Sequence, residues 1–135
     1  MEHKKHSRQF RNILSYPFIW VLIIPLILSD MFLELYHRIC FPLYGLPTIE
    51  RRKYIRIDRH KLKYLSLTDK LSCMYCGYAN GWLHYASVIT GETERYWCSI
   101  KHMKNDSFIE PKHHKDFLEY GDENSFKEST TKVIK

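Results

Sequence analysis

The sequence predicts a mainly helical protein, in which an N-terminal membrane-seeking helix or helical hairpin is followed by a small helical Cys/His metal-binding domain. Three observations predict this architecture. Residues 13–28 carry no charge, residues 50–63 are strongly basic, and two close pairs of cysteine and histidine donors follow. With 135 residues and a net charge of +6, the chain is long enough for one modest core and too short for two independent ones.

Residues 1–12 form a basic segment, and residues 13–47 are expected to form a membrane-associated helical segment. The uncharged run is shorter than the roughly 20 residues that a perpendicular helix needs to cross the hydrocarbon layer. Extension to Tyr44 restores the length but includes four polar side chains that are costly at the bilayer centre, namely Asp30, Glu34, His37 and Arg38. Bulky residues after Ser29 stand where a signal peptidase needs small ones, so we expect the segment to be retained.

The topology of this segment stays open between a crossing and an in-plane helix. Phe32, Leu35, Tyr36 and Ile39 recur at the spacing of a helix that lies in the membrane surface. Pro25 predicts a kink, and Pro42 with Pro47 is expected to close the segment. Because both flanks are basic, a re-entrant or in-plane hairpin with both ends on the cytoplasmic side fits the charges at least as well as a single crossing. A buried helix of a soluble domain is the third alternative.

Residues 48–120 are expected to contain a basic collar and the Cys/His domain. From residue 50 to residue 63, seven cations face two acids. Such a cluster is attracted to anionic lipid headgroups by about 1 kcal/mol per cation. We assign the membrane-surface contact to Arg51, Arg52, Lys53, Arg56, Arg59, Lys61 and Lys63. A nucleic-acid patch ranks lower because no nucleic-acid fold signature accompanies the cluster, and a solvated short strand is the other alternative.

The Cys/His domain is expected to consist of short helices. Thr68 is predicted to cap a helix that begins at Asp69. Gly77 and Gly81 either end this helix or allow another backbone to approach closely. A second helical stripe is assigned to the core, namely Trp82, Tyr85, Ala86 and Ile89. A break is expected at Gly91, before a last helical turn or two.

The metal ligands are predicted from donor type and spacing. Cys73 and Cys76 are one helical turn apart, and Cys98 and His102 are four residues apart, so each pair shares a helix face. Three thiolates and one imidazole are the set that a closed tetrahedral zinc site requires. Two helical pairs that meet at these faces would enclose one Zn2+ ion, and such a staple contributes much of the stability of a small domain. The basic flanks place the domain on the reducing cytosolic side, where disulfides are uncommon.

Other uses of these cysteines stay open. Cys40 in place of His102 would give a four-thiolate site for zinc or an iron–sulfur cluster. The pair Cys73 and Cys76 also suits thiol redox chemistry, although the βαβ pattern that usually accompanies it is missing. Ordinary buried or free thiols are the remaining interpretation. No motif names a reaction, so the sequence favours a protein without catalytic activity and leaves its protein partner and biological role open.

Two further histidine groups carry less weight. Asp30, Glu34 and His37 lie along one helix face, and Glu34 with His37 is half of the pattern of carboxylate-bridged di-iron bundles. Because the other half is absent, we interpret them as the polar side of an interfacial helix. His113 and His114 lie in a polar stretch and are interpreted as solvated. Residues 121–135 are rich in serine, threonine and lysine, and are expected to be disordered.

Several stretches together resemble a small family of uncharacterised bacterial membrane-associated proteins. The resemblance lies in residues 36–45 (YHRICFPLYG), residues 58–65 (DRHKLKYL), residues 73–81 (CMYCGYANG) and residues 96–102 (YWCSIKH). It covers roughly residues 20–120. The resemblance implies a bacterial origin and that these motifs belong together. It implies no activity.

Overall fold

The computed structural model describes residues 2–133 of the chain, and side chains for residues 10–132. Its elements are α1 (Glu2–Val21), α2 (Ile23–Tyr44), η1 (Arg51–Lys53), η2 (Arg59–Lys61), α3 (Leu67–Trp97), η3 (Lys112–Asp116) and α4 (Glu123–Val133). The described residues contain no strand, so the prediction of a mainly helical protein is confirmed. They form two compact units, Met1–Ala86 and Ser87–Lys135, and α3 runs from the first into the second.

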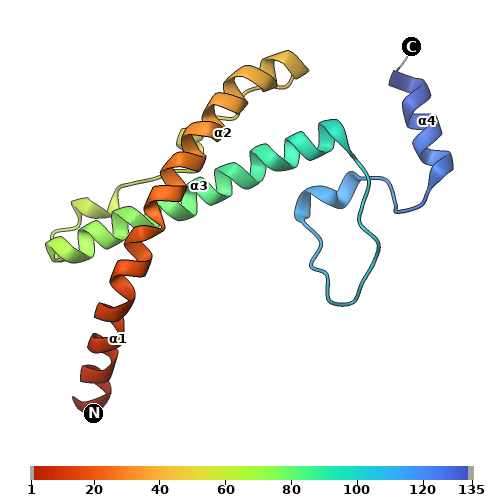
Figure 1. Ribbon diagram of the computed structural model, residues 1–135. Coiled ribbons are helices and arrows are strands. Elements are labelled where there is room, and N and C mark those ends of the chain that lie inside the picture. The colour runs from red at the N-terminus through yellow and green to blue at the C-terminus, as the bar shows by residue number, and fades with distance from the viewer. Residues whose placement is uncertain (1, 134–135) are drawn as a thin grey trace. The chain divides into compact units, whose positions relative to one another are not determined.

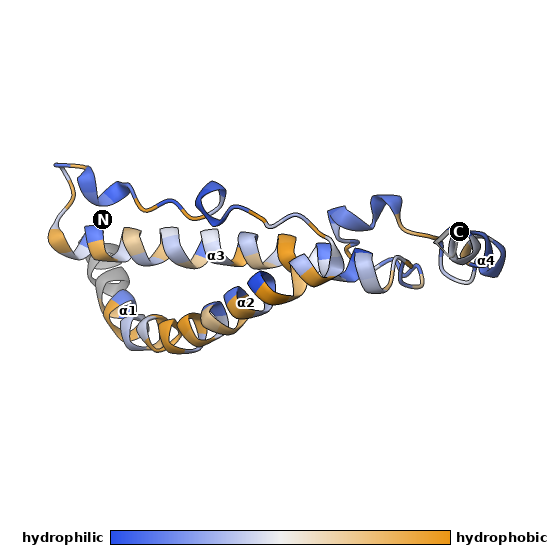
Figure 2. Cartoon of the chain, turned by 90° about the horizontal axis from the view of Figure 1, so that it is seen from above, coloured by the Kyte–Doolittle hydropathy of each residue, from blue (hydrophilic) through white to orange (hydrophobic). Residues whose placement is uncertain are grey.

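Helices α1 and α2 follow one another as one long rod, and Figure 2 shows that this rod is bent. Only Leu22 interrupts them, in a right-handed helical conformation. The interruption follows from Pro25, whose ring clashes with the carbonyl of the residue four positions earlier, Val21, and which has no amide hydrogen to donate to it. The kink is therefore where Pro25 predicts it. From Phe10 to Tyr44 the structure shows one long apolar helical stretch, and the membrane topology of this segment stays a prediction.

The end of α2 is set by glycine and not by proline. Pro42 lies inside the helix, and Gly45 stops it with a left-handed φ of 71°. The amide of Gly45 donates to the carbonyl of Pro42 at 3.1 Å, and that of Leu46 donates to Phe41 at 2.9 Å. This pair of bonds is the Schellman arrangement, which satisfies carbonyls that the helix end would leave free.

The stretch from Phe10 to Tyr44 is long and apolar enough to cross a membrane, and 6% of its most apolar part is buried within the protein. Figure 2 shows the hydrophobic colour concentrated along these two helices. Large apolar side chains are exposed all along them, including Phe10, Ile13, Leu14, Phe18, Val21, Leu22, Ile24, Leu28, Met31, Phe32, Leu35, Ile39 and Leu43. The side chains of residues 1–9, which carry most of the predicted basic N-terminal segment, lie outside those that the structure describes.

Helix α3 begins two residues earlier than predicted and is continuous. Ser66, not Thr68, caps it: the amide of Asp69 donates to Ser66 Oγ at 3.2 Å, and that hydroxyl donates to the Asp69 carboxylate at 2.6 Å. The helix does not end at Gly77, Gly81 or Gly91. The predicted separate helices are therefore one helix of 31 residues.

The glycines of α3 serve the other predicted role, close approach of another backbone. A Cβ atom at Gly81 would lie 2.6 Å from the Tyr54 carbonyl oxygen and 2.9 Å from Ile55 Cα. A Cβ at Gly77 would lie 3.0 Å from the Arg56 carbonyl oxygen. The extended chain after η1 can therefore lie directly on α3 only because these positions have no side chain.

The core of the first unit is small. Phe41 of α2 and Ala79, Trp82 and Tyr85 of α3 are its buried apolar residues. In the second unit, Ile89 and Phe117 are buried. The predicted core stripe is thus confirmed at Trp82, Tyr85 and Ile89.

The C-terminal residues predicted to be disordered contain α4. Asp122 caps it, because its carboxylate accepts the amide of Ser125 at 3.1 Å and the hydroxyl of Ser125 at 2.7 Å. Lys127 and Glu123, four residues apart, form an ion pair at 2.6 Å. Such caps and pairs support a short exposed helix that has little apolar surface to bury.

Candidate metal centre

Two of the four predicted zinc ligands lie on α3 and two lie beyond its C-terminal end. Cys73 and Cys76 lie near the start of α3, in the first unit, and Cys98 directly follows its last residue, Trp97. A helix rises about 1.5 Å per residue, so the stretch from Cys76 to Trp97 is about 30 Å long. The two pairs were expected to meet because the sequence predicted a break between them. Each pair lies in a different unit of the chain, and the four-ligand zinc site stays a prediction.

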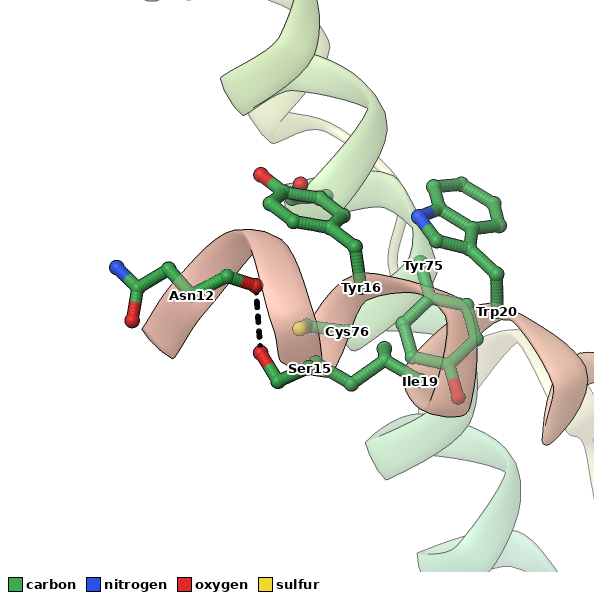
Figure 3. Close-up of a pocket in the computed structure, with 8 residues that line it drawn as sticks. Asn12, Ser15, Tyr16, Ile19, Trp20, Tyr75 and Cys76 are labelled. Atoms are coloured by element: carbon green, nitrogen blue, oxygen red, sulfur yellow. Dashed lines mark hydrogen bonds between the residues drawn. The ribbon is translucent and has the colours of Figure 1, made fainter. Parts of the chain in front are cut away.

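Cys76 lies at a hollow between α1 and α3 within the first unit. Tyr75 and Ser72 of α3 line this hollow with it, opposite α1 residues Asn12, Ser15, Tyr16, Ile19 and Trp20. Figure 3 shows the Cys76 sulfur beside Ser15 and Tyr16. The rings of Trp20 and Tyr75 pack at 5.5 Å between centroids. The thiol of Cys76 is exposed, and those of Cys73 and Cys40 are half-buried; all are free.

In the second unit, Cys98 is exposed and His102 packs among other rings. The His102 ring lies 5.3 Å from Phe108 and 5.5 Å from His114, between centroids. His102 itself is exposed. Of the four predicted ligands, it is therefore the one that adjoins a cluster of metal-binding side chains.

That cluster consists of Glu94, His113 and His114. One oxygen of the Glu94 carboxylate lies 2.7 Å from His113 Nε2, and the other lies 3.1 Å from His114 Nε2. One ligand atom from each of the three residues lies within 4.8 Å of the others, and no other such group of three occurs among the residues that the structure describes. Two imidazoles and a carboxylate therefore converge on one point.

The local fold explains this convergence. Glu94 projects from the last turn of α3, and both histidines lie in η3. Pro111 directly precedes η3. At the other end of η3, the amide of Phe117 donates to the His114 carbonyl at 2.9 Å. A short parallel bridge holds η3 near α3: the amides of Lys101 and Leu118 donate to Leu118 and Ser99, each at 2.8 Å.

Gly91 makes room for His113. A Cβ atom at this helical position would lie 3.1 Å from His113 Cγ and 3.2 Å from Nδ1. Gly91 precedes Glu94 by three residues, so both lie on one face of α3. The missing side chain therefore lets the imidazole lie against the helix with Nε2 directed at the carboxylate.

Burial is uneven across the cluster. His114 is fully buried, and its ring stacks on Phe117 at 4.8 Å between centroids, whereas the side chains of His113 and Glu94 are 26% and 33% exposed. His114 Nδ1 has no hydrogen-bond partner among the described residues. The hydrogen bond from His113, followed by that from His114, lowers the pKa of the Glu94 carboxyl, so the carboxylate is the form that this environment favours.

A second polar cluster lies in the first unit, between α2 and α3. The Arg51 guanidinium binds both oxygens of the buried Asp30 carboxylate, and the Tyr78 hydroxyl donates to Asp30 Oδ2 at 2.7 Å. The hydrogen bond to Asp30 raises the pKa of Arg51. Burial, followed by the same carboxylate, raises the pKa of Tyr78 to about 12. The negative charge of Asp30, which would be costly on an apolar helix, is thus paired with the positive charge of Arg51.

Two turns further along α2 than Asp30, a chain of hydrogen bonds fixes His37. The amide of Ile49 donates to His37 Nε2 at 3.0 Å, so that nitrogen carries no proton. His37 Nδ1 is therefore the donor to the Tyr85 hydroxyl at 3.1 Å, and this hydroxyl donates to Glu34 at 3.1 Å. Burial, followed by the bond to Glu34, raises the pKa of Tyr85 to about 12. The polar side of α2 thus faces protein, and the half di-iron pattern is used in hydrogen bonding.

The predicted membrane-surface cations divide into two groups. Arg52, Lys53, Arg56, Arg59, Lys61 and Lys63 are exposed. Arg51 is instead engaged by Asp30 and lies 3.7 Å from Glu34. The membrane-surface role predicted for these seven cations stays a prediction.

Sequence reasoning passed over Glu94, His113 and His114. The consecutive histidines lie in a polar stretch, and Glu94 lies in the short helix that was expected after a break at Gly91. The signal that was present is Gly91, an unusual residue inside a helix, three positions before an acid. None of the protein-family models, curated proteins or solved structures with which the chain was compared matches it, and the resemblance to a bacterial family stays a prediction.

Proposed function

We propose that this chain is a small membrane-associated protein that binds one divalent metal ion through Glu94, His113 and His114. The observation that carries the proposal is the shared carboxylate, whose two oxygens each meet the Nε2 atom of a different imidazole. One of these imidazoles is fully buried. Burying a histidine beside a carboxylate is unusual unless the pair has a use, and perturbed polar clusters concentrate at functional sites.

The donor set indicates the metal. Imidazole nitrogen and carboxylate oxygen suit zinc and other divalent first-row ions, whereas thiolates would be needed for an iron–sulfur cluster. Bonds of about 2.0–2.2 Å to such an ion require the three side chains to separate slightly, since hydrogen bonds now join them directly. Zn2+ stays the first expectation, and non-haem iron is the alternative.

The membrane part of the proposal rests on the first unit. Side chains such as Phe18, Phe32 and Leu43 are 72%, 71% and 77% exposed, although other side chains of the same helices pack against α3. Exposed apolar surface on this scale is unfavourable in water and favourable in lipid. The exposed cations after Glu50 supply attraction to anionic headgroups beside it.

Elemental analysis of the full chain, purified in detergent, tests the metal site. We expect about one divalent ion per chain for the wild type and loss of that ion in Glu94→Gln, which keeps the side-chain shape. Glu92→Gln is the matched control, because Glu92 is a half-exposed acid in the same turn region whose nearest partner, Arg95, is 4.0 Å away. It should retain the metal.

A Cys76→Ser variant separates this site from the thiolate set predicted from the sequence. The proposal requires Cys76→Ser to keep the metal that Glu94→Gln loses. The reverse result, or a wild type with no divalent ion, overturns the assignment. Circular dichroism of each variant checks that the helices are intact.

A further inference from the structure

We infer that the metal ion at Glu94, His113 and His114 keeps an open coordination position, at which it takes water or a small anion. This inference rests on the proposed metal site and adds a property to it. Structural zinc sites are closed by four protein ligands, whereas three protein ligands leave a position for an exchangeable molecule. Two histidines and one carboxylate are a set that typically leaves positions open.

The number of donors is the first support. The described residues place only these three side chains in the group. The next nitrogen donor is His102, whose ring adjoins His114 at 5.5 Å between centroids, tilted by 41°. It also packs edge-on against Phe108, at 5.3 Å. His102 is thus a neighbour of the site and outside its ligand set.

The direction of the opening is the second support. Phe117, which is 6% exposed, stacks on the buried His114 ring and closes that side. On the side of His113 and Glu94, a quarter to a third of each side chain is exposed. His114 and Phe117 would shield an ion held between the three residues from water on one side. On the other side, the ion would be accessible past His113 and Glu94.

Two features keep the accessible side in place. Gly91 lets the His113 ring lie on α3, where its Nδ1 edge faces the helix and only Nε2 is directed to the carboxylate. Glu94 is held by the helix itself. The specific alternative is a closed site in which the exposed His102, which adjoins His114, is a fourth ligand.

The experiment uses Co2+, which reports coordination by its visible spectrum, with sodium azide as the small anion. The wild type and His102→Ala are each loaded with one equivalent of Co2+ and titrated with azide. We expect both to bind Co2+, and both spectra to change with azide along a saturating curve. Glu94→Gln should show no bound Co2+.

The outcomes separate the two proposals. If the wild type binds no Co2+, or if Glu94→Gln binds Co2+ as the wild type does, the proposed metal site is wrong. The proposed open position is then wrong as well. If the wild type binds Co2+ but its spectrum is indifferent to azide, the metal site stands and the open position is wrong. If azide alters only the His102→Ala spectrum, then His102 is the fourth ligand and the site is closed.

Discussion

At the scale of single residues, the pairing of Asp30 with Arg51 decides how an apolar helix tolerates a charge. The Asp30 side chain is 13% exposed, and its carboxylate accepts hydrogen bonds from both terminal guanidinium nitrogens of Arg51 and from the Tyr78 hydroxyl. Removing one partner of such a pair leaves an uncompensated charge, which costs more than the pair contributes when intact. Arg51 is therefore a structural residue, although the sequence places it in a run of surface cations.

Replacing Arg51 by methionine should lower the free energy of unfolding by about 2 kcal/mol, because Asp30 loses its counter-charge. The measurement is thermal unfolding in detergent, followed by circular dichroism. Arg52→Met is the matched control. Arg52 is the exposed neighbour of Arg51, and its replacement should change the free energy of unfolding by less than about 0.5 kcal/mol. The double variant Asp30→Asn, Arg51→Met should recover part of the loss. Equal effects of the two single variants would contradict the pairing.

At the scale of elements, the sequence predicts helix type better than helix ends. Periodic apolar residues identified the helices of the first unit, and Pro25 located the kink. The ends depended on local hydrogen bonds that composition does not reveal, such as the Ser66 cap and the Gly45 termination. Gly91 was expected to break α3, but its tertiary role, to admit the ring of His113, outweighs its low helix propensity.

The same error explains what the sequence missed at the site. Reading a break at Gly91 separated α3 into helices that could fold back and bring Cys73 and Cys76 to Cys98. With the helix continuous, proximity depends instead on the return of the chain through η3, a contact between residues about twenty positions apart that no periodicity predicts. The His102 ring adjoins that of His114, and its assignment as a zinc ligand beside the three cysteines stays a prediction.

Gly91→Ala tests the fit of η3 against α3. Alanine favours the helix by about 1 kcal/mol, yet its Cβ would push against the His113 ring. We expect metal affinity to fall about tenfold or more, as when supporting residues of metal sites are changed. Ser87→Ala, one turn earlier and exposed, should leave the affinity unchanged. Metal titration with a competing chelator measures both, and an unchanged Gly91→Ala would contradict the fit.

At the scale of the whole molecule, the exposed apolar side chains of α1 and α2 require a covering, and lipid is the covering that we propose. Phe18→Lys combined with Leu22→Lys places two charges in the middle of the apolar stretch, at a cost of roughly 3 kcal/mol each in the bilayer. The double variant should move from the membrane fraction to the soluble fraction of cells, whereas the wild type should resist alkaline carbonate extraction. Asn124→Lys, in α4, is the control and should behave as the wild type. A wild type found in the soluble fraction would refute membrane association.

The helix from Phe10 to Tyr44 has one more consequence, which concerns bilayer thickness. Its 35 residues extend for about 52 Å, against a hydrocarbon layer of about 30 Å. An inserted helix of this length has to tilt steeply, bend at Leu22, or leave its Asp30-containing end among the headgroups. The last choice matches the pairing of that end with Arg51 and α3. Membranes of different thickness would then enclose different lengths of the same helix. The chain would favour a membrane whose hydrocarbon layer covers the apolar residues before Asp30 and leaves the Asp30 carboxylate at the headgroups.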